Sequence, residues 1–184
     1  GYRDDPPAAD GRKVILSDTD HLWGIGGNQA WVWKTFCRGM NPLFMDPYRE
    51  AKARTGAQAE RETNWTNHLS DTPSLDQRWD SIRRNLGYTR RFAQRMKLVA
   101  TVPRSDLAST RYCLADPGAE YLIYIPDGGK VTVDLSDASG KLKVEWLNPS
   151  TGESKPGQEA TGGGWCELTA PFVGDAVLYI AART

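Results

Sequence analysis

The chain has 184 residues, of which 39% are hydrophobic and 25% charged, a composition that predicts a globular protein of one or two domains. Its 23 basic and 23 acidic residues balance, so no overall electric field favours nucleic acid or an anionic membrane, and small neutral partners are favoured instead. The apolar runs are far shorter than the roughly 20 residues of a membrane-spanning helix, and we expect neither a membrane nor a nucleic-acid partner.

The residues before about Pro103 alternate between strand and helix patterns. Residues 13–17 form a short apolar stretch typical of a strand, and residues 28–39 carry apolar side chains at helical spacing. A second strand is predicted at residues 43–46. Because the connection between the two strands is short, we expect them to lie parallel in one sheet, joined by a right-handed crossover.

A second helix is predicted after a long irregular segment. Ser74 and Gln77, three residues apart, form a capping-box signature, and apolar side chains then continue along one helical face to about Lys97. The irregular segment, residues 47–73, directly follows a predicted strand. Loops of this length in compact domains are uncommon unless they are functional or disordered, so this segment is a candidate contributor to a site.

From about Tyr112 onward, apolar and polar residues alternate as they do in antiparallel sheets. Turns rich in Gly, Pro, Asn and Asp separate the predicted strands at residues 120–125, 131–135, 142–146, 165–169 and 176–181. About six short strands in this space predict a small β-sandwich. The alternation is expected to bury Val131, Val133, Leu142, Val144 and Trp146, and to expose Lys141, Lys143 and Glu145.

The cysteines and histidines do not form a metal-site pattern. Cys37, Cys113 and Cys166 are too few and too scattered for a disulfide framework or a zinc site, although one bridge between Cys113 and Cys166 stays open. His21 and His68 lack metal-ligand spacing. We therefore expect no metal and no cofactor. The sequence leaves the compartment open, and the periplasm and the extracellular space are both compatible with it.

Carboxylates and aromatic side chains gather after the first predicted strand, in VILSDTDHLWGIGG at residues 14–27. In parallel α/β architectures, ligands bind at the carboxyl ends of the strands. The ends of the two predicted strands therefore present one shared rim, which consists of Asp18, Asp20, His21, Trp23, Asp46 and Tyr48. A structural interpretation is equally open for any single residue, with the aspartates capping the next segment and the tryptophan packing in the core.

Two aspartates one residue apart also suggest a phosphatase. The haloacid-dehalogenase superfamily carries Asp-x-Asp at the end of its first strand, with the first aspartate as nucleophile. That family has a threonine where this chain has Leu22, and no matching lysine and acidic pair follows downstream. An Asp-x-Asp metal site of the glycosyltransferase type lacks supporting residues as well. The glycines do not form a dinucleotide-binding loop, because Gln29 occupies the third glycine position.

Longer stretches of the chain resemble a known family. Residues 12–110, with VILSDTDHLWGIGG, AWVWKTFCRGMNPLFMDPY and RRNLGYTRRFAQRM, resemble the end of the catalytic barrel in glycoside-hydrolase-like proteins. Residues 111–184, with YCLADPGAEYLIYIPDGG, VEWLNPSTGE and APFVGDAVLYIA, resemble the β-domain that follows that barrel and is labelled as collagen-binding. The resemblance implies an α/β plus all-β fold. Residues 1–110 would be the last two βα units of a (β/α)8 TIM barrel, and residues 111–184 a small antiparallel β-sandwich.

The resemblance also implies roles for the rim residues. In related hydrolases a glutamate at the end of the next-to-last strand is the nucleophile, and Asp18 falls closest to that position, with Asp20 on the same side. The shorter aspartate side chain leaves an electrostatic or hydroxyl-binding role open beside the catalytic one. Stacking against a sugar ring and hydrogen bonds to its hydroxyl groups are implied for the remaining rim residues, His21, Trp23, Asp46 and Tyr48.

Two classes of function remain. The first is a carbohydrate-active hydrolase region that binds a carbohydrate substrate and needs the missing barrel strands from an upstream region or another chain. The second is a non-catalytic binding or scaffolding module, and an Asp-x-Asp phosphatase is a weaker alternative. A glycosidase needs two carboxyl groups on either side of the scissile bond, and the implied acid lies on an earlier strand. We therefore expect the 184-residue chain alone to be inactive.

Overall fold

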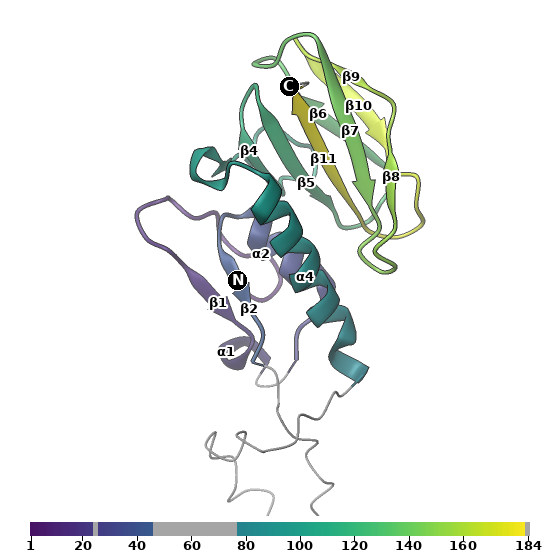
Figure 1. Ribbon diagram of the computed structural model, residues 1–184. Helices are drawn as coiled ribbons and strands as arrows, with labels where there is room; N and C mark the ends of the chain where they lie inside the picture. Colours follow the sequence, from purple (N-terminus) through teal and green to yellow (C-terminus); the bar gives the residue numbers. More distant parts are fainter. Residues whose placement is uncertain (24–25, 46–76, 183–184) are drawn as a thin grey trace, which may run out of the picture.

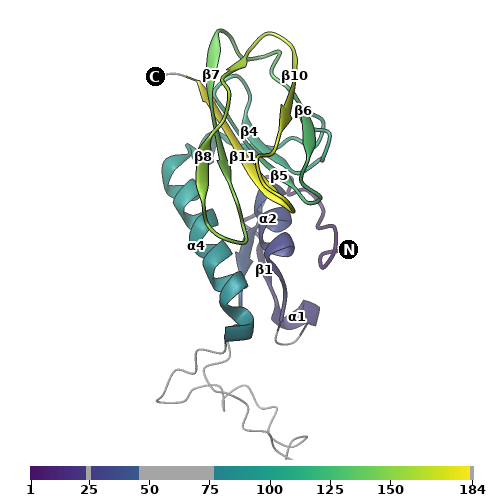
Figure 2. The same cartoon turned by 90° about the vertical axis from the view of Figure 1, so that its right-hand side faces the viewer.

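The computed structural model describes residues 1–23, 26–45 and 77–182. Most of its strands belong to one antiparallel sheet, with helices on one face and a two-stranded ribbon on the other (Figures 1 and 2). In chain order the elements are β1 (Leu16–Asp18), α1 (Asp20–Trp23), α2 (Gln29–Cys37), β2 (Asn41–Leu43), a 3-10 turn (Gln77–Trp79), α4 (Asp80–Arg95), a second 3-10 turn (Leu98–Ala100), β3 (Val102–Pro103), β4 (Cys113–Asp116), β5 (Glu120–Ile125), β6 (Lys130–Asp134), β7 (Lys141–Leu147), β8 (Ser154–Pro156), β9 (Ala160–Thr161), β10 (Trp165–Thr169) and β11 (Ala176–Ala182). Within these ranges, no helix combines the length and apolar character that a bilayer span requires.

A strand, a helix and a strand near the start of the chain form a small parallel unit. α2 begins after Asn28, whose side-chain oxygen accepts a hydrogen bond from the backbone N of Trp31 at 2.8 Å. The turn after α2 contains Gly39, whose φ of +76° is the left-handed conformation that favours glycine. The chain then reverses, and β2 pairs in parallel with β1, with Leu43 opposite Asp18. The parallel pairing expected from the short connection is observed.

The predicted fold class, two βα units of a TIM barrel followed by a small β-sandwich, is nevertheless wrong. In the described part of the chain, β1 and β2 form a separate two-stranded sheet, and the remaining strands pair antiparallel. Hydrophobic periodicity shows which face of a helix is apolar, but it does not show which sheet that face covers. Here α2 and α4 pack on the antiparallel sheet instead of surrounding a ring of parallel strands.

The antiparallel sheet has the strand order β3-β4-β5-β11-β7-β8, and β9 also pairs with β7. The last strand in the sequence, β11, lies in the middle of this sheet between β5 and β7. All six residues of β5 are buried, because the sheet is covered on both faces. The ribbon of β6 and β10 covers one face, and the helices cover the other, so the sheet and the helices share one core rather than forming an isolated sandwich (Figure 2).

The helical face is held by apolar packing and by one buried amide. The apolar residues are Trp33, Phe36 and Cys37 from α2, Phe92 from α4, Met96 after it, Tyr112, and Leu114, Leu122, Tyr124, Leu147 and Val177 from the sheet. Asn85 of α4 accepts a hydrogen bond from Trp33 Nε1 at 2.7 Å and donates one to the carbonyl of Pro149 at 3.0 Å. These bonds tie α4 both to α2 and to the loop after β7.

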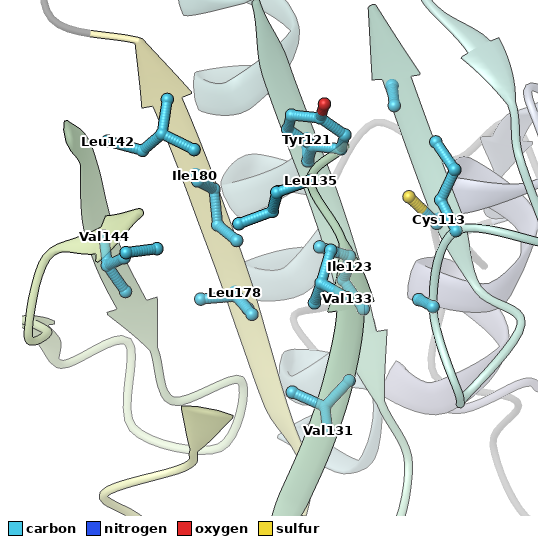
Figure 3. Packing of buried hydrophobic residues seen from close by; sticks show 14 of the residues in the cluster. Cys113, Tyr121, Ile123, Val131, Val133, Leu135, Leu142, Val144, Leu178 and Ile180 are labelled. Carbon is cyan, nitrogen blue, oxygen red and sulfur yellow. The ribbon is translucent and has the colours of Figure 1, made fainter. Parts of the chain in front are cut away.

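The ribbon face confirms the predicted alternation of β6 and β7 (Figure 3). The residues predicted to be buried are all buried: Val131, Val133, Leu142, Val144 and Trp146. Lys141 and Lys143 are exposed as predicted, whereas Glu145 is half-buried because its carboxylate binds Arg95 of α4. Cys113 packs in the same core. All three cysteines are free thiols, so the structure contains no Cys113–Cys166 bridge.

Candidate functional site

β1 ends in a polar corner where the chain turns into the four-residue helix α1. Asp18 is the last residue of β1, and its Oδ1 accepts hydrogen bonds from the backbone N of His21 at 3.3 Å and from Nδ1 of His21 at 3.0 Å. Asp20 lies beside this pair, with its Oδ2 3.9 Å from the same ring nitrogen. The corner therefore presents a carboxylate and an imidazole in direct contact, with a second carboxylate next to them.

The contact between Asp18 and His21 shifts both protonation equilibria. The hydrogen bond from the imidazole lowers the pKa of Asp18, because a donated proton stabilises the ionised carboxylate. The same hydrogen bond raises the pKa of His21 above its ordinary value of 6.5, and the charges of Asp18 and Asp20 add to this effect. Each group thus favours the charged form of the other.

The same three side chains place one nitrogen or oxygen atom each within 4.8 Å of one another. Such atoms can coordinate a divalent cation. The His21 side chain is, however, 83% exposed, and its Nδ1 is already hydrogen-bonded to Asp18. Exposed acidic groups often lie together without an ion, and we assign no metal to this corner.

Thr19, between the two aspartates, holds the corner against the end of β2. Its backbone N donates to the carbonyl of Leu43 at 3.1 Å, and its Oγ1 accepts a hydrogen bond from the backbone N of Met45 at 3.0 Å. The residue is fully buried. Sequence reasoning missed this role. A signal was present, because side chains alternate along a strand, and a β-branched residue between two acidic residues therefore points toward the core while its neighbours point toward solvent.

Trp23 closes the corner from the side of α1. Its ring packs edge-on against Trp31 of α2, with 5.5 Å between the ring centroids, and the guanidinium of Arg3 lies 5.3 Å from its centroid. The side chain is half-buried. Trp23 therefore has a packing role, as the structural interpretation predicted, and retains partial exposure at the corner.

The structure brings four of the six predicted rim residues into one corner: Asp18, Asp20, His21 and Trp23. Asp46 and Tyr48 lie outside the described residues, as does Ser74 of the predicted capping box. The catalytic and substrate-binding roles of all six stay predictions.

A groove of about 560 Å³ lies elsewhere, where the C-terminal end of α4 meets β7, β8 and β11. Arg95 lines it and forms an ion pair of 2.9 Å with Glu145, while its guanidinium lies 4.2 Å from the ring centroid of Tyr179. The Tyr179 hydroxyl donates to Glu120 at 2.7 Å, and burial raises the pKa of Tyr179 to about 12. Sequence reasoning missed this groove, because its residues come from elements far apart in the chain.

The comparisons with known proteins match different portions of the chain. Residues 100–180 match a family model described as "Putative collagen-binding domain of a collagenase". No curated protein matches the chain. Among solved structures, a protein named glycoside hydrolase has a TM-score of 0.57 and 14% identity over 84% of this chain and 36% of its own. A family 5 glycoside hydrolase from Bacteroides vulgatus has the same score and identity over 83% of this chain and 35% of its own.

This chain is similar in fold to part of two glycoside hydrolases. It spans about a third of the length of the two structures. The resemblance drawn from the sequence is therefore confirmed in its coarser form: a fold related to part of glycoside hydrolases, with a match to a domain model named for collagen binding.

Proposed function

We propose that this chain is part of a longer carbohydrate-active protein of the glycoside-hydrolase type. In this proposal residues 111–184 form an accessory β-domain, and the β1–α1 corner contributes to a sugar-binding rim. The observation that carries it is the similarity in fold, over 84% of the chain, to a protein named glycoside hydrolase. The corner supports it, because carboxylate oxygens and an imidazole offer acceptors and a donor for sugar hydroxyl groups.

The proposal gives the corner residues separate roles. Asp18, held by His21, is the carboxylate that acts on or orients the sugar, and Asp20 is a second acceptor beside it. Their carboxylate oxygens lie within 4.8 Å of each other on one corner. Glycosidic cleavage needs carboxyl groups on opposite sides of the bond, about 5 to 5.5 Å apart for retention and about 6.5 to 9.5 Å for inversion. Because Asp18 and Asp20 lie on the same corner, the proposal assigns the opposing carboxyl group to another part of the longer protein.

A hydrolysis assay tests this proposal. The chain alone should show no turnover of aryl glycosides or oligosaccharides, because in this proposal the opposing carboxyl group belongs to another part of the longer protein. The longer protein that contains it should be active, and Asp18→Asn in that protein should lower kcat by about a hundredfold or more. Asp10→Asn, on an exposed side chain outside the corner, is the matched control. Turnover by the chain alone, or full activity of both Asp18→Asn and Asp20→Asn, would contradict the assignment.

The match of residues 100–180 favours a second candidate, a non-catalytic binding module. Its family model is named for collagen binding, so the test is cosedimentation with collagen fibrils. A module of this kind should pellet with fibrils, and Asp18→Asn should not change the bound fraction. Retention of the chain in the supernatant at all fibril concentrations would exclude this candidate.

We also propose that another polypeptide segment of the longer protein covers the β1–β2 pair. Parallel strands are ordinarily buried on both faces, yet this pair exposes the side chains of Leu16 and Leu43, and the neighbouring Val14 and Met45 are exposed as well. The chain alone should therefore bind a hydrophobic dye, and Leu16→Ser should weaken that binding. Val173→Ser, on an exposed loop away from this pair, is the control. Equal dye binding by all three proteins would contradict this expectation.

A further inference from the structure

The outer face of the β6–β10 ribbon carries an exposed tryptophan among hydrogen-bonding groups. Trp165, the first residue of β10, is 64% exposed, more than any other Trp, Tyr or Phe in the described ranges. The face points away from the helices (Figure 2). Because alternate residues of both strands enter the core, the outer face is formed by the cross-strand pairs Trp165 and Asp134, Glu167 and Thr132, and Thr169 and Lys130.

The backbone before Trp165 is fixed by hydrogen bonds and by a close approach. Gly163 N donates to the carbonyl of Leu135 at 2.9 Å, and Leu135 N donates to the carbonyl of Gly164 at 3.0 Å. A Cβ at Gly162 would lie 2.4 Å from the carbonyl oxygen of Ala138, so a larger residue does not fit there. The turn therefore holds the tryptophan at a defined place on the ribbon, where its ring stays in water unless a ligand covers it.

The cross-strand partner of Trp165 offers an unused acceptor beside the ring. Oδ1 of Asp134 accepts hydrogen bonds from the backbone N and the hydroxyl of Ser136, at 3.0 and 2.5 Å. Its Oδ2 has no partner in the part of the chain that the structure describes. On the same face, Glu167 binds Lys130 at 2.7 Å. A hydroxyl group above this face thus meets an open carboxylate oxygen next to an aromatic ring.

The charge of the face limits the ligand. Two carboxylates, Asp134 and Glu167, face one ammonium group, Lys130, so the face is slightly negative and disfavours phosphate, sulfate and uronic acid groups. A neutral sugar suits it better, since the C–H face of a pyranose ring packs on an aromatic ring while its hydroxyl groups donate to carboxylates.

We propose that the outer face of the β6–β10 ribbon is a binding platform for a neutral polysaccharide, on which Trp165 stacks against a pyranose ring and Asp134 accepts a hydroxyl proton. The proposal rests on the proposed carbohydrate function for the class of ligand. It concerns a second surface, on the opposite side of the sheet from the helices, with residues that take no part in the β1–α1 corner.

Affinity electrophoresis of the full chain tests the platform. Native gels contain hydroxyethyl cellulose, galactomannan or soluble starch, and a parallel gel contains carboxymethyl cellulose as the anionic counterpart. We expect at least one neutral polymer to retard the wild type, and the anionic polymer to retard it less. Trp165→Ala should weaken retardation about tenfold. Trp165→Phe should retain part of it, and Asp134→Asn should weaken it less than Trp165→Ala does.

Val173→Ala, which truncates a fully exposed apolar side chain in another loop, should migrate like the wild type. Because Trp165 is exposed, its alanine variant should keep the wild-type melting temperature, which separates lost binding from lost folding. Equal retardation of wild type and Trp165→Ala would overturn the proposal. So would the absence of retardation by every neutral polymer, or a Trp165-dependent retention on collagen fibrils without retention on polysaccharide.

The proposal for the ribbon platform and the proposal for the β1–α1 corner can be refuted independently. Asp18→Asn should leave retardation unchanged, because the corner and the ribbon share no residues. Trp165-dependent retardation without any Asp18-dependent hydrolysis in the longer protein would support the platform and contradict the proposed rim. Asp18-dependent hydrolysis with Trp165-independent retardation would do the reverse.

Discussion

The Asp18–His21 contact makes the β1–α1 corner sensitive to pH from both sides. His21 has a raised pKa, so its contribution to stability is fully present below about 6.5, its ordinary value, and is lost as pH rises through the raised value. Asp18 has a lowered pKa, so its contribution is present above its ordinary 3.8 and is lost as pH falls through the lowered value. Both charges are in place between these two ordinary values.

The His21 pKa can be measured directly by following its ring protons by NMR. We expect a midpoint above 6.5 in the wild type and a lower midpoint in Asp18→Asn, because the hydrogen bond that the His21 ring donates to the Asp18 carboxylate is the main cause of the shift. Asp20→Asn should lower the midpoint less, since Asp20 acts only through its charge. A midpoint that is the same in wild type and Asp18→Asn would show that the contact does not form in solution.

Asn85 is the buried polar residue whose loss should matter most. In Asn85→Ala the Trp33 indole N–H and the Pro149 carbonyl lose their partner inside the helical layer. Leaving buried groups unpaired costs about 1 to 3 kcal/mol each, so we expect the free energy of unfolding to fall by roughly 2 to 4 kcal/mol in urea titrations. Arg84→Ala, on the exposed face of α4, should change it by less than about 0.5 kcal/mol. Equal stability of the two variants would refute the role of Asn85.

Among the strands, β7 places side chains on both faces of the sheet. Leu142, Val144 and Trp146 enter the core below the ribbon, while Glu145 reaches Arg95 of α4 on the other face. The alternation of this strand therefore links the ribbon, the sheet and the helical layer. A one-residue slip in its pairing with β11 would move all of these side chains to the wrong face.

Truncation of Trp146 tests the core below the ribbon. The side chain is almost fully buried, so Trp146→Ala should lower the free energy of unfolding by about 3 to 5 kcal/mol in thermal or chemical denaturation. Lys143→Ala, an exposed position on the same strand, should stay within about 0.5 kcal/mol of the wild type. If Trp146→Ala melted like the parent but lost a glycan or protein partner, Trp146 would be a binding residue instead.

In the described part of the molecule, the helices of the first half share an apolar core with the sheet of the second half, and the β6–β10 ribbon covers the other face of that sheet. Trp33 and Phe92 bury their rings among sheet residues such as Leu122. Each half buries part of its apolar surface only against the other, so we expect the folding of the two to be linked. The division into residues 1–110 and 111–184 stays a prediction, and the shared cluster leads us to expect that the two halves unfold together.

We expect a chain cut after residue 110 to remain unfolded or to aggregate, because its helices lose the sheet on which they pack. The full chain should unfold in one calorimetric transition over the described layers. Circular dichroism of the fragment and calorimetry of the full chain check both statements. A sharp melting transition in the 1–110 fragment, or two independent transitions in the full chain, would show that the halves fold separately.

Elements with local signals could be predicted from the amino-acid sequence. The helix at α2, the alternation of β6 and β7, and the polar corner after β1 were all readable, because periodicity and caps depend on neighbours a few residues away. Three features became visible only in the folded chain: which sheet the helices cover, the bond of Thr19 between the two parallel strands, and the exposed position of Trp165 on the ribbon. These facts depend on pairings between distant segments, for which a two-residue or 3.6-residue period carries no information. The barrel prediction was wrong for this reason. The sequence pattern of one parallel strand–helix–strand unit is the same whether the helix packs in a barrel or on an antiparallel sheet.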